Sequence, residues 1–338
     1  MFTNRRDQEA ELSTDGRLIY AIGDIHGRLD LLDRLLRQIA QDIAEINPTE
    51  RPILIFLGDY VDRGPSSHGV IGRLLALGAA EALDVRTLKG NHEQAMLEFL
   101  EDVAKGPEWI SYGGAATLSA YGVQPPAIDA DDEAWADAQM KFASRVPAEH
   151  LAFLRRLELS ATYGDYVFVH AGVRPGVPLE DQRETDLLWI RDDFLSAPGP
   201  FEKIVVHGHT PREEAFMGRY RLGLDTGACM TGVLTAARLQ DGDQTLLQTK
   251  SLGRSDEDWD DDPAEPGRGL FAGPLDFLGR AFAGHGAANG KPSSPDEHGP
   301  PADSHIGDLL RPEVARSALL VGLLALSFAV LIYSFAVN

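Results

Sequence analysis

Apolar and polar positions alternate in blocks along residues 1–250. Five short apolar runs each lead directly into a polar motif that contains glycine. These are RLIYAI before GDIHG, ILIFL before GDYVDRG, VRTL before KGNHEQ, YVFV before HAG and KIVV before HGHT. Short apolar runs are typical of buried strands, and polar residues at strand ends commonly build sites. The pattern therefore predicts buried strands that carry functional side chains at their C-terminal ends.

Two segments between these strands have apolar residues that recur with the period of a helix. They are LDLLDRLLRQIAQDIAEI, residues 29–46, and GVIGRLLALGAAEAL, residues 69–83. Strands that alternate with helices predict an α/β fold. The later runs RLGLDT, VLTAARL and TLLQT lack long intervening helices, so we expect them to form an antiparallel sheet.

The composition changes after residue 250. Residues 251–312 are rich in Gly, Pro, Asp and Ala and include the acidic cluster SDEDWDDDPAEP. Such a segment buries too little apolar surface to order itself, so we predict a flexible linker. The chain is therefore expected to consist of a folded domain, 1–250, a linker, 251–312, and a final segment, 313–338.

The final segment is apolar, and its stretch SALLVGLLALSFAVLIYSFAVN, residues 317–338, carries no charge. As a helix it would span about 33 Å, enough for the core of a bilayer. A buried core helix is the alternative, but soluble helices rarely lack a polar face over this length. Arg311 and Arg316 precede the stretch. By the positive-inside rule we predict a single-pass inner-membrane anchor with the folded domain in the cytoplasm.

The charge and the cysteine content restrict the possible partners and the possible kinds of metal site. The formal net charge is −21 and the sequence contains no basic stretch, so we expect no nucleic-acid partner. The single cysteine, Cys229, cannot form an internal disulfide, and no CxxC metal motif occurs. We interpret Cys229 as a small buried residue.

The strand-end motifs share one kind of chemistry. Their side chains offer carboxylate, amide or imidazole donors and no thiolate, namely Asp24, His26, Asp59, Asn91, His92, His170 and His209. This mixture suits divalent metals, and we expect Mn²⁺, with Fe²⁺, Zn²⁺ or Mg²⁺ as alternatives. A lone histidine is more often an ordinary core or surface residue, but five strand ends with the same chemistry favour a metal site.

The spacing indicates how the donors meet. Asp24 and His26 are two residues apart, so both side chains project to the same side of an extended segment. Gly23 and Gly27 flank them and permit a sharp turn. Asp59 has two carboxylate oxygens and can serve two metals. Two ions about 3.5–4 Å apart can clamp the oxygens of an in-line displacement, and a water that bridges them is a hydroxide near neutral pH.

The motifs GDIHG, GDYVDRG and GNHE, followed by HAG and HGHT, resemble those of the phosphoprotein phosphatase family of serine/threonine phosphatases, especially its bacterial and phage members. The resemblance covers residues 17–240. It implies the calcineurin-like metallophosphoesterase fold, an α/β/β/α sandwich in which helices flank two sheets. It also implies two metal ions, the first bound by Asp24, His26 and Asp59 and the second by Asp59, Asn91, His170 and His209.

The resemblance also implies catalytic roles. Arg63 would bind phosphate as a planar fork, and Arg191 matches the family's second phosphate-binding arginine in a looser motif. His92 would protonate the leaving alkoxide, and Asp62 would orient His92 and raise its pKa. For Arg191 the alternative is a surface ion pair with one of the two aspartates that follow it.

Four further features stay open. Glu93 and Asp225 are candidates to orient ligands, and His207 is either structural or close to the metals. The segment WISYGGAATLSAYG, residues 109–122, resembles one that lies near the active-site rim of bacterial family members.

Together these features predict a metal-dependent phosphomonoesterase that acts on phosphoserine or phosphothreonine in proteins, with phosphotyrosine as a further option. The expected nucleophile is a hydroxide that bridges two metal ions. The anchor suggests membrane-associated phosphoproteins as partners. A diadenosine tetraphosphatase is the alternative enzyme, because it shares the fold and the metals. A membrane-tethered binding protein with an inactive metal site is the third hypothesis. The sequence contains no CxxxxxR phosphatase loop, GxSxG elbow or Walker P-loop.

Overall fold

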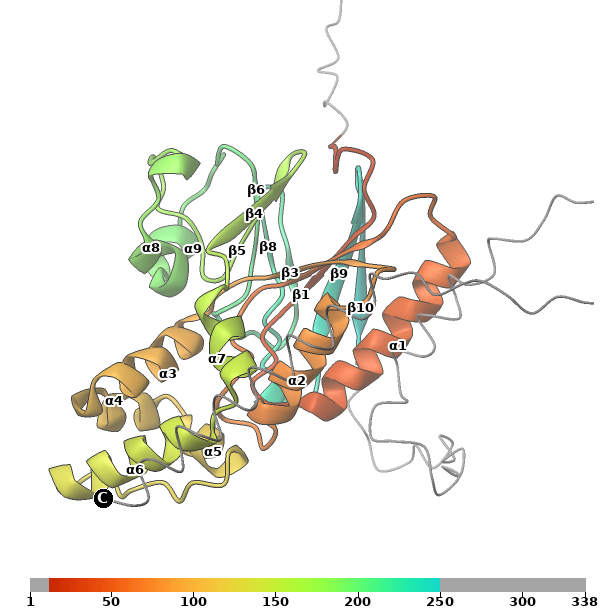
Figure 1. Ribbon diagram of the computed structural model, residues 1–338. Coiled ribbons are helices and arrows are strands. Elements are labelled where there is room, and N and C mark those ends of the chain that lie inside the picture. Colours follow the sequence, from red (N-terminus) through yellow and green to blue (C-terminus); the bar gives the residue numbers. More distant parts are fainter. Residues whose placement is uncertain (1–11, 250–338) are drawn as a thin grey trace, which may run out of the picture. The chain divides into compact units, whose positions relative to one another are not determined.

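The computed structural model describes residues 12–249, in which two β-sheets pack against each other between helices (Figure 1). The first sheet has the order β10 (Asp243–Gln248), β9 (Thr235–Gln240), β1 (Ile19–Ile22), β2 (Ile53–Phe56) and β3 (Asp84–Thr87). The second has the order β4 (Ser160–Tyr163), β5 (Tyr166–Val169), β6 (Ile204–His207), β8 (Arg221–Gly223) and β7 (Phe216–Met217).

The central strands are apolar on both faces because both faces are covered. In β1, Ile19 and Ala21 belong to the core between the two sheets, whereas Tyr20 and Ile22 belong to the core under the helices. In the second sheet, β5 divides its residues in the same way. The near-continuous apolar runs in the sequence therefore reflect burial on two sides rather than one.

Helices cover the outer faces of the sheets and extend beyond them (Figure 1). The helices are α1 (Leu29–Ile46), α2 (Ser67–Gly78), α3 (Asn91–Glu101), α4 (Gly106–Ser111), α5 (Gly114–Ala120), α6 (Asp132–Arg145), α7 (Ala148–Arg155), α8 (Glu184–Trp189), α9 (Asp192–Leu195) and α10 (Ala228–Thr231), with short 3₁₀ turns at Val103–Lys105 and Leu179–Asp181. Residues of α1 and α2 pack on the first sheet, and residues of α8 and α9 pack on the second. This arrangement confirms the expected α/β fold with helices on both sides.

The first helix shows how the sequence specifies an element. Residues of α1 such as Leu32, Leu35, Ile39 and Ile43 are buried and recur at helical spacing along one face. The helix ends at Asn47, which has a left-handed φ of 52° and donates its backbone N–H to the carbonyl of Ile43. The predicted range 29–46 is confirmed.

Two expectations about the strands were wrong in part. The run VRTL is not fully buried, because β3 is the edge strand of its sheet and each of its positions is only half-buried. The later runs do not form one antiparallel sheet. Strands β9 and β10 pair antiparallel and join β1, whereas β8 lies in the other sheet, parallel to β6. Their separation follows from the two-sheet core, which a local pattern does not reveal.

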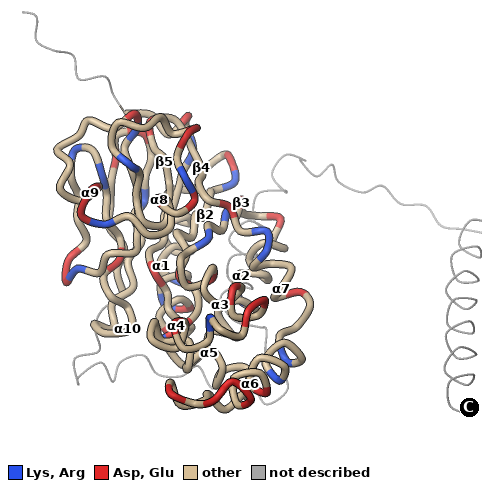
Figure 2. The backbone as a smooth tube through the Cα atoms, turned by 90° about the vertical axis from the view of Figure 1, so that its left-hand side faces the viewer, with Lys and Arg blue, Asp and Glu red and all other residues tan. Residues whose placement is uncertain are grey.

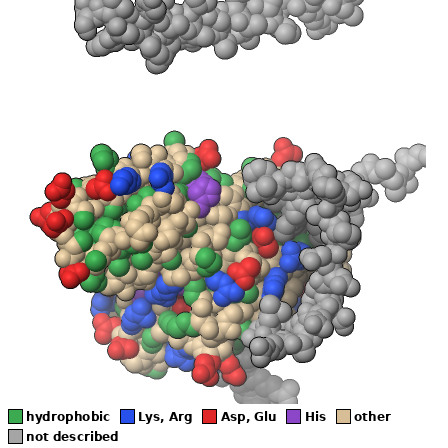
Figure 3. All heavy atoms as spheres, turned by 90° about the horizontal axis from the view of Figure 1, so that it is seen from below, with side chains coloured by type: hydrophobic (Ala, Val, Ile, Leu, Met, Phe, Trp, Pro, Cys, Tyr) green, Lys and Arg blue, Asp and Glu red, His purple; other side chains and the backbone are tan. Residues whose placement is uncertain are grey.

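Residues 12–249 include no helix long and apolar enough to cross a membrane. The predicted linker, 251–312, and the predicted anchor, 313–338, lie outside the described residues. Residues of both charge signs are interspersed along the described backbone (Figure 2). The face in Figure 3 likewise mixes acidic, basic and hydrophobic side chains.

Candidate metal centre

The predicted donor residues meet where strands of both sheets end. Strand β1 leads to His26, β2 to Asp59, β5 to His170 and β6 to His209, while Asn91 is the first residue of α3. All five side chains are buried, with at most 4% of their surface exposed. Each sheet therefore contributes donors to one buried centre, as the carboxyl ends of neighbouring parallel strands do in α/β folds.

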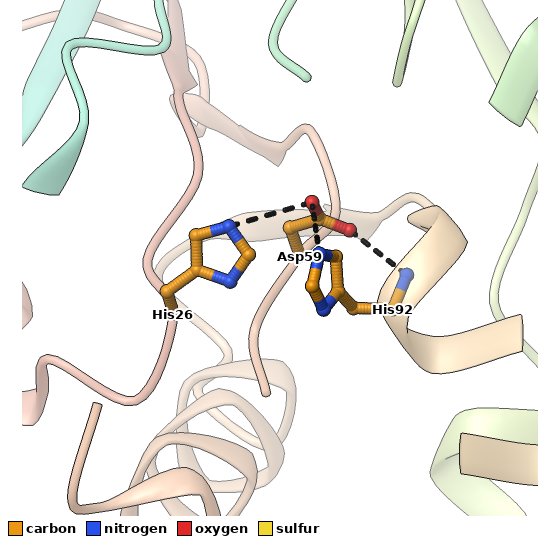
Figure 4. A group of neighbouring side chains, drawn as sticks. All are labelled: His26, Asp59 and His92. Atoms are coloured by element: carbon orange, nitrogen blue, oxygen red, sulfur yellow. Dashed lines mark hydrogen bonds and ion pairs between the residues drawn. The ribbon is translucent and has the colours of Figure 1, made fainter. Parts of the chain in front are cut away.

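Two groups of donors share Asp59. Ligand atoms lie within 4.8 Å of one another in the group His26, Asp59 and His92 and in the group Asp59, His170 and His209. Figure 4 shows the first group, in which Oδ2 of Asp59 lies 3.5 Å from Nε2 of His26 and 3.8 Å from Nε2 of His92. Oδ1 of Asp59 lies 3.3 Å from Nε2 of His170. One carboxylate oxygen thus faces each group, which is what a residue bridging two metals requires.

The imidazoles are held in the form that binds metals. Nδ1 of His26 lies 2.9 Å from the carbonyl oxygen of Val61, and Nδ1 of His170 lies 2.9 Å from that of Leu57. A carbonyl oxygen only accepts, so each Nδ1 carries the proton and each Nε2 presents a lone pair to the centre. Burial lowers the pKa of His26 to about 3 and that of His209 to about 2, which keeps both neutral at pH 7.

The second group is incomplete without a cation. Nε2 of His170 and Nδ1 of His209 each lie 2.9 Å from Oδ1 of Asn91. Because Nε2 of His170 is unprotonated, its contact with Asn91 brings two acceptors together. Nε2 of His209 is buried and has no hydrogen-bond partner. A divalent cation would satisfy these atoms, and the mixture of oxygen and imidazole donors fits one.

The carboxylates give independent support for a cation. Asp24 accepts the backbone N–H of His209 at 3.0 Å and is paired with Asp225. Burial, followed by the charges of Asp225 and Asp59, raises the pKa of Asp24, and burial raises the pKa of Asp225 to about 6. Within residues 12–249, no Lys or Arg forms an ion pair with any of these three aspartates. A bound cation would supply the missing positive charge.

Asp24 belongs to neither group of donors, and its carboxylate accepts the backbone N–H of His209. His92 occupies the third place in the first group, although the resemblance made His92 the acid and Asp24 the ligand. Nδ1 of His92 lies 2.7 Å from Oδ2 of Asp62. Burial lowers the pKa of His92, but the carboxylates of Asp59 and Asp62 outweigh it, and the pKa is raised overall. A raised pKa suits a proton donor better than a metal ligand.

Asp62 has two further partners that sequence reasoning missed. Nε1 of Trp109 donates to Oδ2 of Asp62 at 2.9 Å, and Oγ1 of Thr117 donates to Oδ1 at 2.6 Å. Both belong to the segment 109–122, so its resemblance to a rim segment was the available signal. These bonds hold the carboxylate that in turn holds His92.

Glu93 fixes the backbone of the GDYVDRG loop. Its carboxylate accepts four backbone N–H groups, those of Gly90, Asp59, Tyr60 and Val61. Three non-glycine residues of this loop have left-handed φ values, 53° at Asp59, 70° at Asp62 and 66° at Arg63. Such conformations cost about 1–3 kcal/mol each and persist where the surroundings hold them. Glu93 therefore positions the donors without being one of them.

Arg63 reaches the first group from an exposed position. Its Nη1 lies 2.8 Å from Nε2 of His26 and its Nη2 lies 3.0 Å from Nε2 of His92. The two donors of the guanidinium fork thus point at the nitrogens that face the centre. An anion bound there would be within reach of both donors.

Arg191 reaches the second group. Its Nη1 lies 3.4 Å from the carbonyl oxygen of His209, and its side chain is exposed. The alternative ion pair with Asp192 or Asp193 is not formed, and Asp193 pairs instead with Arg174 at 3.0 Å. Arg191 thus pairs with neither aspartate and has only long hydrogen bonds to His209 and Thr210, so it can meet an anion, although it contacts the centre less closely than Arg63 does.

His207, which the sequence left undecided, and Cys229, which we interpreted as buried, have structural contacts. Nδ1 of His207 donates to the carbonyl of Gly208 at 3.0 Å, and its ring packs against Phe194. Cys229 is half-buried rather than buried, and its Sγ donates to the carbonyl of His26 at 2.9 Å. Burial raises the pKa of Cys229 to about 11, so it remains a thiol with little nucleophilic character.

Known proteins resemble this chain over the same region. The sequence model of the family described as calcineurin-like phosphoesterase matches residues 17–240. Serine/threonine-protein phosphatase 1 of Salmonella typhimurium is 27% identical over 66% of this chain and 93% of its own length. A protein of Anoxybacillus flavithermus named asymmetrical bis(5'-nucleosyl)-tetraphosphatase is 25% identical over 64% and 88%. Serine/threonine-protein phosphatase 2 of Escherichia coli is 28% identical over 66% and 94%.

Proposed function

We propose a reaction for this chain, which belongs to the calcineurin-like phosphoesterase family. The chain is a metallophosphoesterase, and we infer that it removes phosphate from phosphoserine and phosphothreonine side chains of proteins. Two of its relatives are named serine/threonine-protein phosphatases. The observation that carries the proposal is the carboxylate of Asp59, which is shared by two donor groups beside the His92–Asp62 pair.

The donor residues would hold two divalent ions. We assign Asp24, His26 and Asp59 to the first ion, and Asp59, Asn91, His170 and His209 to the second. When bound, the ions would supply Lewis acidity that activates water and offsets the charge of the phosphoryl group. Mn²⁺ is the metal we expect, and Fe²⁺, Zn²⁺ and Mg²⁺ suit the same donors.

The other residues bind phosphate and move a proton. Arg63 would hold two phosphate oxygens with its fork, and Arg191 would hold another from the side of His209. His92 would donate the proton on Nε2 to the oxygen of the leaving alcohol, whose departure is otherwise unfavourable. Asp62 would keep His92 in the required orientation and charged until that transfer. None of these steps needs a side-chain nucleophile.

Hydrolysis of diadenosine tetraphosphate is the second candidate, because a relative of similar identity is named a bis(5'-nucleosyl)-tetraphosphatase. The full-length chain should be assayed with a phosphothreonine peptide and with diadenosine tetraphosphate, with and without Mn²⁺. Metal-dependent phosphate release from the peptide at the higher kcat/KM is the result we expect. A clear preference for the dinucleotide would overturn the proposal and leave the metal site intact.

We also propose that the chain is tethered to the inner membrane by residues 313–338, with the catalytic domain in the cytoplasm. The uncharged stretch 317–338 supports this, together with the two arginines before it. A tether would raise the concentration of the domain near membrane-associated phosphoproteins. Deletion of 313–338 should move the protein from the membrane pellet to the supernatant. A truncated protein that still sediments with membranes would overturn the tether.

A further inference from the structure

Two aromatic side chains border the metal centre and have no part in the chemistry above. We call Tyr112 and Trp189 the aromatic wall. The ring of Tyr112 lies 6.2 Å from that of His92 and 5.6 Å from that of Trp189, centroid to centroid. The ring of Trp189 lies 6.4 Å from that of His209. The wall therefore extends from the proposed acid to the second donor group.

The polar ends of both rings are already occupied. Oη of Tyr112 donates to Glu108 at 2.9 Å, and Nε1 of Trp189 donates to Oε1 of Gln94 at 2.8 Å. Both side chains are half-buried. What they can offer a ligand is therefore apolar ring surface, because the polar atom of each ring already has a partner.

The backbone at Tyr112 is hydrogen-bonded to the phosphate-binding arginine, Arg63. Nε of Arg63 donates to the carbonyl of Tyr112 at 3.3 Å, and the backbone N–H of Arg63 donates to the carbonyl of Gly113 at 3.1 Å. A phosphate held by Arg63 must present its leaving oxygen within hydrogen-bond reach of Nε2 of His92. The organic group on that oxygen then lies beside Tyr112.

We propose that the aromatic wall binds the leaving group of the substrate and favours a planar aromatic one, the side chain of phosphotyrosine in a polypeptide. The inference rests on the proposed function, because it uses the same centre and the same acid. Water adds to phosphorus, the bond from phosphorus to the phenolic oxygen breaks, and His92 gives that oxygen a proton. The products are inorganic phosphate and tyrosine. Stacking of one ring on another is expected to contribute about twofold to tenfold to binding.

The test must separate the wall from the chemistry of the leaving group. A phenol leaves more readily than an alcohol, so a higher rate on phosphotyrosine does not by itself implicate the wall. The informative quantity is the ratio of kcat/KM for two peptides of identical sequence, one with phosphotyrosine and one with phosphothreonine, compared between the wild-type chain and a variant. The intrinsic difference between the leaving groups is the same in both proteins and cancels.

Full-length Tyr112→Leu and Trp189→Leu should each lower that ratio about twofold to tenfold, mainly through a higher KM for the phosphotyrosine peptide. Tyr112→Phe keeps the ring and should keep the ratio. Tyr163→Leu, which removes a half-buried tyrosine of β4, should also leave the ratio unchanged. An equal fall in kcat/KM for both peptides in Tyr112→Leu and Trp189→Leu would overturn the proposed role of the aromatic wall and leave the proposed function intact. Cleavage of neither peptide by the wild-type chain, with cleavage of diadenosine tetraphosphate, would overturn both.

Discussion

The two donor groups of the centre differ in how completely the protein satisfies them. In the first group, both ring nitrogens of His26 and of His92 have partners, supplied by Val61, Asp62 and Arg63. In the second group, Nε2 of His209 has no partner, and the lone pair of His170 faces the oxygen of Asn91. In the first group Arg63 thus contacts the nitrogens that face the centre, whereas the second group leaves acceptor atoms that no protein donor satisfies.

This difference matches the roles that we propose for His92 as general acid and for the second group as metal ligands. A general acid must hold its orientation before the substrate arrives, so its partners are protein groups that are always present. In the second group Nε2 of His209 has no protein donor and can bind a metal directly, whereas Nε2 of His26, which we assign to the first ion, is contacted by Arg63. Variants that affect the two groups separately should therefore give different combinations of lost metal and lost activity.

Asp59→Asn should have the largest effect, because Asp59 is the residue common to both groups. An amide carries no charge and offers one acceptor oxygen in place of two. We expect loss of both metals and a fall in kcat of at least about 10³-fold, since several kcal/mol of charge stabilisation is removed. Metal content by mass spectrometry and phosphate release check this. Full metal occupancy in the variant would contradict a bridging role for Asp59.

His92→Asn should lower activity without releasing a metal ion. We expect kcat on the phosphothreonine peptide to fall by about 10²–10⁴-fold, the range for loss of a general acid. Metal content should be unchanged, and the loss should be smaller for an aryl phosphate, whose leaving group needs less protonation. If His92→Asn released a metal ion instead, His92 would be a ligand, as its place in the first group permits.

Asp62→Asn should change the pH dependence. His92 must be protonated to act, so activity falls as the pH rises through its pKa. Asp59 and Asp62 raise that pKa against the effect of burial. Removal of the Asp62 charge should therefore move the alkaline limb of the pH–kcat profile to lower pH, with a loss of about 10- to 100-fold near neutral pH. Thr117→Val removes one hydrogen bond to Asp62 but keeps its charge, so the alkaline limb should not move to lower pH.

The sequence could predict the donors but not what holds them. His26, Asp59, His170 and His209 follow apolar runs, so strand periodicity alone placed them at one end of the sheets. Trp109 and Thr117 reach Asp62 from 47 and 55 residues away along the chain. No local spacing encodes such contacts, because they depend on how α4 and α5 pack against the loop.

The pairing of the two rings in the aromatic wall escaped sequence reasoning for the same reason, although Tyr112 lies in the segment 109–122. Tyr112 and Trp189 lie far apart in the chain and meet only in the fold. The edge position of β3 and the transfer of β8 to the second sheet were missed likewise, since the choice of partner strand is a tertiary property. The local pattern thus predicts which side chains lie at the end of a strand, and tertiary packing decides which strands become neighbours.

Glu93→Gln is expected to have the smallest effect on chemistry and a measurable one on stability. A carboxylate accepts four N–H groups, whereas the amide of Gln turns a donor toward some of them. At least one buried N–H would lose its partner, at a cost of about 1–3 kcal/mol in the free energy of unfolding. The left-handed loop from Asp59 to Arg63 would lose part of its support. Denaturant unfolding of the metal-free protein measures this effect without the contribution of bound ions.

Glu98→Gln is the matched control on the same helix. The side chain of Glu98 is 42% exposed and lies 3.9 Å from Lys105, so its loss should change the unfolding free energy by less than about 1 kcal/mol. Equal stability of Glu93→Gln and Glu98→Gln would show that the loop holds its conformation without Glu93. A specific loss in Glu93→Gln would instead show that the orientation of Asp59, and with it both donor groups, depends on a residue that binds neither metal nor substrate.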